Sequence, residues 1–174
     1  MTKPMVKLSE YDSKWEIQFQ YEKKRITDVL AAKVVGIEHI GSTSIGGLVS
    51  KPIIDIIIGV EDLNDPHTLV SPLRKIEYEY IPKPELVSRR FFRKGFWGQG
   101  ICHLHVCEYQ SNEWKEKLLF RDYLRSHREA AEVYSLLKQK LASKYQFDRQ
   151  TYTKKKEPFI KYIIEKASRE IYTT

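Results

Sequence analysis

Hydrophobic residues recur at helical spacing near the start of the chain. The stripe consists of Trp15, Phe19, Glu22, Ile26, Val29 and Leu30, with the glutamate as its one polar member. Positions three and four residues apart share one face of a helix, so this spacing predicts a helix over residues 14–32. Ser13 followed three residues later by Glu16 has the pattern of a capping box. We therefore expect this pair to start the helix.

Short apolar runs follow and predict strands. Residues 34–40, VVGIEHI, are rich in β-branched side chains, and residues 53–58, IIDIII, are so uniformly apolar that we expect a strand covered on both faces. Three further runs, IEYEYI, RRFFRKGF and ICHLHVCEY, occupy residues 76–81, 89–96 and 101–109. The segment WGQG joins the last two, and its glycines suit a hairpin turn. About five strands are predicted.

Helical spacing returns after Ser111. Three stripes are formed by Trp114, Leu118 and Leu124, by Ala130, Tyr134, Leu137, Leu141 and Tyr145, and by Phe159, Ile163, Ala167 and Ile171. The third helix is expected to start near Pro158. Asp65 before Pro66 predicts a further short helix, which Pro72 would bend or end. The fold class is therefore α+β, with a mixed, mostly antiparallel sheet, an N-terminal helix and C-terminal helices.

Composition limits the size and location of the protein. With 174 residues and 41% hydrophobic content, the chain can bury one core, and we expect a single domain over residues 1–174, with 111–174 as its helical C-terminal part. The start of the chain lacks the apolar centre of a signal peptide, and Cys102 and Cys107 are the two cysteines. No run approaches the roughly 20 apolar residues of a membrane helix. These features predict a cytoplasmic protein with reduced thiols and no membrane partner.

The segment GSTS, residues 41–44, indicates a phosphate-binding loop. Its glycine permits close approach, and the backbone amides and hydroxyls of Ser42, Thr43 and Ser44 can converge on one anion. Asp55 lies in the strand that follows, where its carboxylate could hold a metal against that phosphate, and Lys51 is near enough to contact it. In the alternative, structural interpretation, the glycines serve turns, the hydroxyls cap a short helix, Asp55 pairs with a buried base, and Lys51 is solvated.

Two histidines share one face of a predicted strand. His103 and His105 are two residues apart, so both rings point the same way, and Cys107 follows them. With Asp55 they could supply three metal ligands, or they could bind phosphate or act as acid and base. The structural alternative is a pair of half-buried histidines satisfied by their surroundings. His39 and Glu38 lie on opposite faces of their strand, so at most one of them can join this group.

Other basic residues favour structural roles. Arg89, Arg90 and Arg93 alternate with aromatic residues, an arrangement that suits a nucleotide or an exposed strand face. Arg121 and Arg125 lie one helical turn apart with Asp122 between them, which favours a network of salt bridges. The run KKK at residues 154–156 is typical of a solvated surface. The net charge of +7 is consistent with anionic partners such as nucleotides or RNA.

Several of these segments together resemble the GrpB family. They are IEHIGSTS, GLVSKPIIDI, HLHV and LLFRDYLRSHREAAEVYSLLKQKLASKY, and the likeness extends over nearly the whole chain. The family fold is similar to that of the nucleotidyltransferase superfamily, so the resemblance implies a nucleotidyltransferase-like sheet. One departure is Gly46 in STSIGGL, where the family shows proline in STSVPGL. That change is expected to loosen the loop.

The resemblance also implies a site pattern, which this chain meets only in part. The superfamily places a Gly-Ser pair ahead of a strand that carries two carboxylates separated by one hydrophobic residue. Gly41, Ser42 and Asp55 match this pattern, whereas Ile57 occupies the second carboxylate position. Two metal ions need clustered carboxylates, so His103 and His105 would have to complete the site.

Three functions are consistent with the sequence. The first is a nucleotidyltransferase-like protein that binds a nucleoside phosphate or another phosphorylated small molecule with Mg²⁺ or Mn²⁺ and transfers a nucleotidyl or phosphoryl group to a small acceptor. The second is a noncatalytic nucleotide-binding or RNA-binding module that has lost the second carboxylate. The third is a mononuclear metal hydrolase that uses Asp55, His103 and His105 and prefers Zn²⁺ or Mn²⁺.

Overall fold

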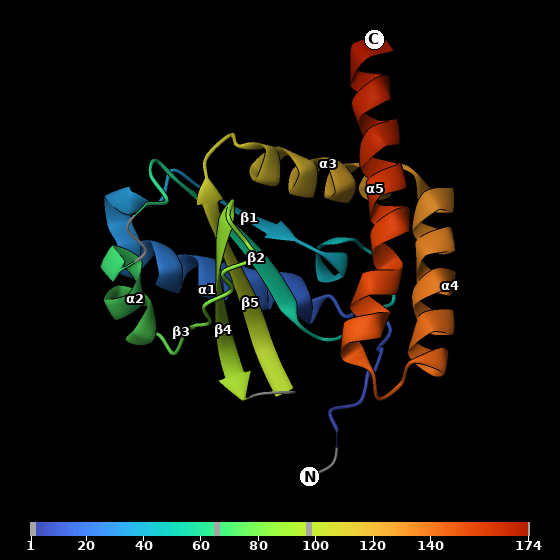
Figure 1. The fold of residues 1–174 in the computed structure, drawn as a ribbon, viewed down its shortest axis with the longest axis horizontal. Coiled ribbons are helices and arrows are strands. Elements are labelled where there is room, and N and C mark those ends of the chain that lie inside the picture. The colour runs from blue at the N-terminus through green and yellow to red at the C-terminus, as the bar shows by residue number, and fades with distance from the viewer. Residues whose placement is uncertain (1–2, 65–66, 97–98, 174) are drawn as a thin grey trace.

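The centre of the molecule is a five-stranded mixed sheet (Figure 1). The computed structural model describes residues 3–64, 67–96 and 99–173. Its strands are β1 Gly36–Ile40, β2 Ile54–Val60, β3 Glu79–Tyr80, β4 Arg89–Phe96 and β5 Gln99–Glu108. They lie in the order β1-β2-β5-β4-β3, with β2 and β5 parallel and the other neighbours antiparallel. The predicted α+β class with a mostly antiparallel sheet is confirmed.

Helices cover both faces of the sheet. Helices α1 (Lys14–Leu30) and α2 (His67–Arg74) pack on the face that carries Ile54, Ile56 and Ile58 of β2. A short 3₁₀ turn, Ala31–Lys33, follows α1. Helix α3 (Asn112–Ser126) lies on the opposite face, where its Trp114 packs against Ile57. The uniformly apolar run of β2 is thus buried on both sides, as its composition predicts.

Two more helices complete the C-terminal part. Helix α4 spans Arg128–Lys144 and α5 spans Arg149–Thr173, and both pack with α3 around a second core. They stand beside the sheet, and the C-terminal end of α5 extends beyond the other helices (Figure 1). Ile45 and Leu48, from the segment between β1 and β2, insert into this second core. That segment therefore joins the sheet to the C-terminal helices.

Helix α1 starts at Lys14 as predicted, but the predicted capping box at Ser13 and the predicted start of the last helix near Pro158 are wrong. Ser13 has helical dihedral angles of −59° and −19° and its side chain makes no capping bond. Instead, Asp12 Oδ1 accepts a hydrogen bond of 2.9 Å from the amide of Lys14. Helix α5 starts at Arg149 instead of near Pro158, because the Asp148 carboxylate accepts from the amide of Thr151. The proline is accommodated inside α5.

The remaining differences concern short segments. The predicted strand at residues 76–81 is reduced to two residues because Glu77 has a φ of 72° and the amide of Tyr78 donates to Leu73 of α2, which continues the turn. Helix α2 contains Pro72 and ends at Arg74. The predicted cap at residues 65–66 and the first half of the WGQG turn, residues 97–98, lie outside the described residues. Over the part of the chain that is described, no helix has the length and apolar character needed to cross a membrane.

Candidate functional site

Asp55, His103 and His105 come together on one face of the sheet. The parallel pairing of β2 with β5 sets Asp55 beside His103 and Ile57 beside His105. Asp55 Oδ1 lies 3.4 Å from His103 Nδ1 and 3.7 Å from His105 Nε2. These separations are too long for strong hydrogen bonds. The Asp55 side chain retains 29% of its exposure, so a ligand can reach it.

The electrostatics of this group favour an ionised acid beside a neutral imidazole. Burial would raise the pKa of Asp55, but the adjacent imidazoles of His103 and His105 favour its ionised form more strongly, so its pKa lies well below the usual range. Burial lowers the pKa of His105 to about 4, although Asp55 opposes that change. His105 is therefore neutral at pH 7. Within the described residues its buried Nδ1 has no hydrogen-bond partner.

Gly41 lets the backbone approach the Asp55 carboxylate. Its φ is 71° and its ψ is −175°, a combination that essentially only glycine adopts. A Cβ atom at this position would lie 2.5 Å from Asp55 Oδ2 and 3.0 Å from Asp55 Cβ. The Gly-Ser pair and the aspartate of the sequence pattern thus meet in space, and the glycine is required by that contact.

Hydrogen bonds fix the Gly-Ser loop, which we define as residues 41–51. Its first residues form a short 3₁₀ turn, Ser42–Ser44. The Thr43 hydroxyl donates to the carbonyl of Ile53 and the Ser44 hydroxyl donates to the carbonyl of Gly41. Both side chains are buried, so their hydroxyls stabilise the turn. Ser42 differs, because its hydroxyl is half-buried and accepts a hydrogen bond of 2.9 Å from Lys138 Nζ.

Further contacts hold the loop from both sides. His39 stacks on Phe19 of α1 and its Nε2 lies 3.0 Å from Thr43 Oγ1, so it faces away from Asp55. Glu38 lies on the Asp55 side of β1, where it pairs with Arg121 at 2.6 Å. Arg125 donates two hydrogen bonds of 2.9 and 2.7 Å to the Ser44 carbonyl. These residues anchor the turn.

Three lysines gather at the loop from three segments. Lys138 of α4 is 2% exposed, and its Nζ also donates to the carbonyl of Val49. Lys51 Nζ and Lys156 Nζ lie 5.5 and 4.5 Å from the ring centroid of Tyr152. Burial lowers the pKa of Lys138 to about 7 and that of Lys156 to about 8, and neighbouring lysine charges add to both shifts. We call Lys51, Lys138 and Lys156 the lysine cluster.

Ile57, which occupies the position of the second carboxylate in the superfamily pattern, is buried. Ile57 has no exposed surface and packs with Ile40, Cys107 and Trp114. Burial raises the pKa of the Cys107 thiol to about 11, so the thiol stays protonated and is a poor metal ligand. Both cysteines are free and buried. The residues that flank Asp55 and His105 toward α3 therefore belong to the core.

The remaining arginines are held in ion pairs or by backbone carbonyls. Arg89 pairs with Glu113 at 2.8 Å, and Arg93 pairs with Glu79 at 3.1 Å. Arg90 donates to the carbonyl of Val87. Each of these arginines therefore has a partner within the protein, although the buried Nε atoms of Arg89 and Arg93 form no hydrogen bond with the described residues.

Sequence reasoning missed Lys138 and Lys156. Lys138 lies four residues after Tyr134, inside the apolar stripe of its helix, and Lys156 lies four residues after the buried Tyr152. Residues four apart share a helix face. A lysine inside an apolar stripe is thus the signal that could have identified both residues.

The side chains of Asp55, His103 and His105 are of types that bind metals, but their geometry does not form a metal site by itself. A carboxylate and two imidazoles are ligands that Mn²⁺ and Zn²⁺ accept, and the His105 nitrogen that faces Asp55 is Nε2, at 3.7 Å from Oδ1. Yet among the residues with described positions, no group of three or more His, Cys, Asp and Glu side chains is arranged to hold a metal ion. A metal at Asp55 would therefore need further ligands from a bound molecule.

Comparison with known proteins identifies relatives over most of the chain. The family model described as GrpB protein matches residues 5–166. Glutamate-rich protein GrpB of Alkalihalophilus pseudofirmus is 33% identical over 168 residues, which cover 94% of this chain and 97% of that protein. The crystal structure of conserved protein GrpB from Enterococcus faecalis matches with a TM-score of 0.87 and 32% identity, covering 95% of this chain and 99% of that one.

Other relatives are longer than this chain. A UPF0157 protein of Pseudomonas aeruginosa is 38% identical over 158 residues, or 90% of this chain and 65% of that protein. UPF0157 protein YqkA of Bacillus subtilis is 35% identical over 169 residues, or 96% of this chain and 48% of that protein. The chain thus spans about two thirds of one of these proteins and about half of the other.

Proposed function

Since the chain belongs to the GrpB family, whose fold resembles that of nucleotidyltransferases, we propose that it binds a nucleoside phosphate beside residues 41–44 and Asp55. The observation that carries the proposal is the meeting of the Gly-Ser loop, a partly exposed carboxylate and the lysine cluster at one place. Cationic side chains next to a close-approach glycine favour phosphate over neutral ligands.

The phosphate would lie where Ser42 and Lys138 meet. The Ser42 hydroxyl is the one side-chain group of residues 41–44 that is not used in holding the turn to itself or to β2. Lys51 and Lys138 bring positive charge to the same loop. Thr43 and Ser44 contribute by fixing the backbone.

An aromatic ring on the same face of the sheet supplies a surface for a base. Phe91 of β4 pairs in register with His105 and its ring lies 5.2 Å from the ring of His103 and 5.4 Å from that of His105. It is half-buried, and Lys83 lies 4.4 Å from its centroid. Bases stack on exposed aromatic faces.

A divalent metal would be held between Asp55 and the phosphate. Asp55, with His103 or His105 beside it, would supply the protein ligands, and phosphate oxygens would supply the rest, which fits the lack of a preformed cage in the described residues. When bound, such a metal would neutralise phosphate charge during phosphoryl or nucleotidyl transfer to a small acceptor. Mg²⁺ and Mn²⁺ are the ions proposed.

A noncatalytic binding module is the second candidate, and the burial of Ile57 favours it. Nucleotidyl transfer with two metals needs a second carboxylate on this strand face, and Ile57 is covered by α3. Phosphate binding by lysines does not need that carboxylate. The mononuclear hydrolase has less support, since it needs a set of three protein ligands.

The test is to replace Asp55 by asparagine and Asp28, an exposed residue of α1, by asparagine as a matched control. Nucleotide binding is measured by calorimetry with EDTA and with Mn²⁺. With EDTA, Asp55→Asn should bind ATP at least as tightly as the unmodified protein, because a repelling carboxylate is gone. With Mn²⁺, the unmodified protein and Asp28→Asn should gain affinity and Asp55→Asn should not. Equal gains in all three proteins would contradict the role of Asp55.

Group transfer is scored in the same samples. Release of pyrophosphate or phosphate that needs both Mn²⁺ and Asp55 supports the transferase. Binding without turnover over a panel of small acceptors supports the noncatalytic module.

A further inference from the structure

The lysine cluster brings basic side chains from three segments to the Gly-Ser loop. Lys51 precedes β2, Lys138 is on α4 and Lys156 is on α5, so three separate segments deliver one ammonium group each. Lys51 and Lys156 approach the same Tyr152 ring, and Lys138 bonds to Ser42 in the same loop. Lys138 is almost fully buried and the other two are half-buried.

No carboxylate balances these charges. Among the described residues, none of the three lysines forms an ion pair, whereas most other inward-facing bases do, such as Lys94 with Glu22 at 2.8 Å. Asp55 attracts Lys51 and Lys156 without contacting them. Buried ammonium groups are costly unless they are paired. An arrangement that brings the buried Lys138 together with two half-buried lysines is therefore explained best by an anion that the protein binds.

The required anion carries several charges. A single phosphate carries a charge of about −1.5 to −2 at pH 7, which is less than the charge of the three ammonium groups. Consecutive phosphates carry enough negative charge to balance all three lysines, and they offer several oxygens for hydrogen bonds with the ammonium groups and with Ser42. Charge-assisted hydrogen bonds of this kind are the strong ones in proteins.

We infer that Lys51, Lys138, Lys156 and Ser42 form a subsite for a linear polyphosphate, the diphosphate or triphosphate group of a small molecule. This inference rests on the proposed phosphate site and extends it by naming the length of the phosphate chain. It assigns a ligand-binding role to Lys156, the last residue of the KKK run, and separates it from Lys154 and Lys155, which are exposed.

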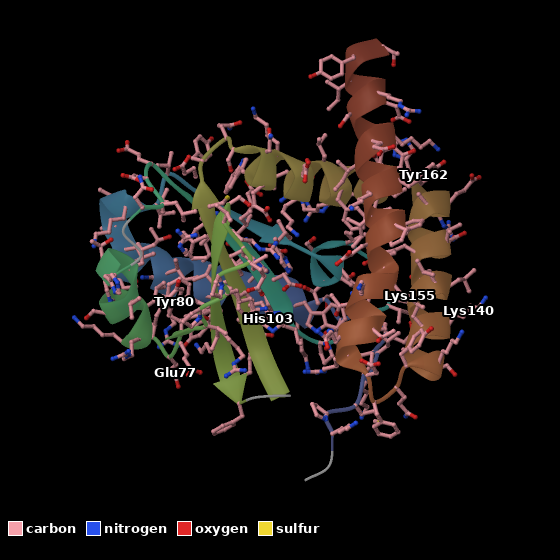
Figure 2. All side chains as sticks on the ribbon, viewed as in Figure 1. Glu77, Tyr80, His103, Lys140, Lys155 and Tyr162 are labelled. Atoms are coloured by element: carbon pink, nitrogen blue, oxygen red, sulfur yellow. The ribbon has the colours of Figure 1, made fainter. Side chains whose placement is uncertain are left out.

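Calorimetry with simple anions in EDTA tests the subsite without any metal. Orthophosphate, pyrophosphate and tripolyphosphate are titrated into the unmodified protein and into Lys156→Gln, Lys51→Gln and Lys155→Gln. Lys155, labelled in Figure 2, is the matched control because it is exposed and adjacent to Lys156. Far-ultraviolet circular dichroism and the melting temperature verify that each variant is folded.

Tripolyphosphate should bind about a hundredfold more tightly than orthophosphate. Lys156→Gln and Lys51→Gln should each weaken tripolyphosphate binding by about ten- to a hundredfold, because each removes one charge-assisted hydrogen bond. Orthophosphate binding should change less in Lys156→Gln. Lys155→Gln should stay within about twofold of the unmodified protein for all three anions.

Three results would overturn the inference. If orthophosphate and tripolyphosphate bind equally and Lys156→Gln changes neither, the phosphate site stands but has no polyphosphate subsite. If a single-stranded RNA binds more tightly than tripolyphosphate and Lys155→Gln weakens it as much as Lys156→Gln, the lysines belong to an extended nucleic-acid surface. If none of the anions binds, and ATP with Mn²⁺ does not bind either, the proposed function fails as well.

Discussion

Replacing Gly41 by alanine tests how the loop and the carboxylate depend on each other. The new methyl group would lie 2.5 Å from Asp55 Oδ2, where a real Cβ contact does not occur, and the backbone φ of 71° disfavours any L side chain. Either the loop or Asp55 must move. The variant therefore perturbs the site without changing a charge or a hydrogen-bonding group.

The expected loss of stability follows from three contributions. The unfavourable backbone region costs about 1–3 kcal/mol, and the steric overlap costs about 1–3 kcal/mol. The alanine also restricts the unfolded chain, which returns about 0.4–1 kcal/mol. The free energy of unfolding should thus fall by about 1–6 kcal/mol, with about 3 kcal/mol at the centre of that range. A domain of typical stability, about 5–15 kcal/mol, survives the central value.

The control is Gly46→Ala in the same loop. A Cβ at Gly46 would meet no atom within 4 Å, and its φ is not in the left-handed region. This variant should be unchanged or stabilised by up to about 1 kcal/mol, since it restricts only the unfolded chain. Urea unfolding followed by tryptophan fluorescence measures both variants. If Gly41→Ala lies within about 0.5 kcal/mol of the unmodified protein and keeps its Mn²⁺-dependent nucleotide binding, the close-contact argument is wrong.

Two further predictions concern buried charges. Lys138 has a folded pKa of about 7 against 10.5 for an ordinary lysine, because of burial and its lysine neighbours. Between these two pKa values the unfolded chain binds more protons than the folded protein, so the free energy of unfolding should rise by about 1–2 kcal/mol from pH 7 to 8.5. Urea titrations at several pH values measure this rise, and a flat profile would contradict the prediction. Bound tripolyphosphate should reduce the rise. Glu22→Gln should lower the free energy of unfolding by about 3 kcal/mol, because it leaves the buried Lys94 without its charged partner at 2.8 Å. A fall in melting temperature of less than about 2 °C would show instead that Glu77 compensates fully for the lost charge.

The elements of the fold were predictable because their patterns are long and regular. The stripe of α1 has the helical period, the uniform apolar run of β2 is typical of a strand covered on both faces, and His103 and His105 alternate with apolar residues along β5. The ends of helices were less predictable, since they depend on which neighbouring side chain accepts from the first amides. Asp12 does so in place of Ser13, and Asp148 starts α5 nine residues before Pro158.

The site was predictable where strand register decides it. Side chains alternate between the two faces along β2 and β5, and the register of these strands places Asp55, His103 and His105 on one face. The structure brings these three side chains together. The lysine cluster was not predictable in this way. Its members come from a loop and two helices whose mutual positions depend on the packing of Ile45 and Leu48 into the second core.

The balance of charge at the site argues for a protein that neutralises its ligand with lysines more than with metal ions. A two-metal site concentrates carboxylates, and the metals then neutralise the phosphates. Here the second carboxylate position is the buried Ile57, and the Asp55 carboxylate attracts Lys51 and Lys156. If this is correct, most of the affinity for a polyphosphate should persist in EDTA, and Lys156→Gln should weaken binding more than metal removal does. The reverse order would mean that Asp55 and its metal dominate the site.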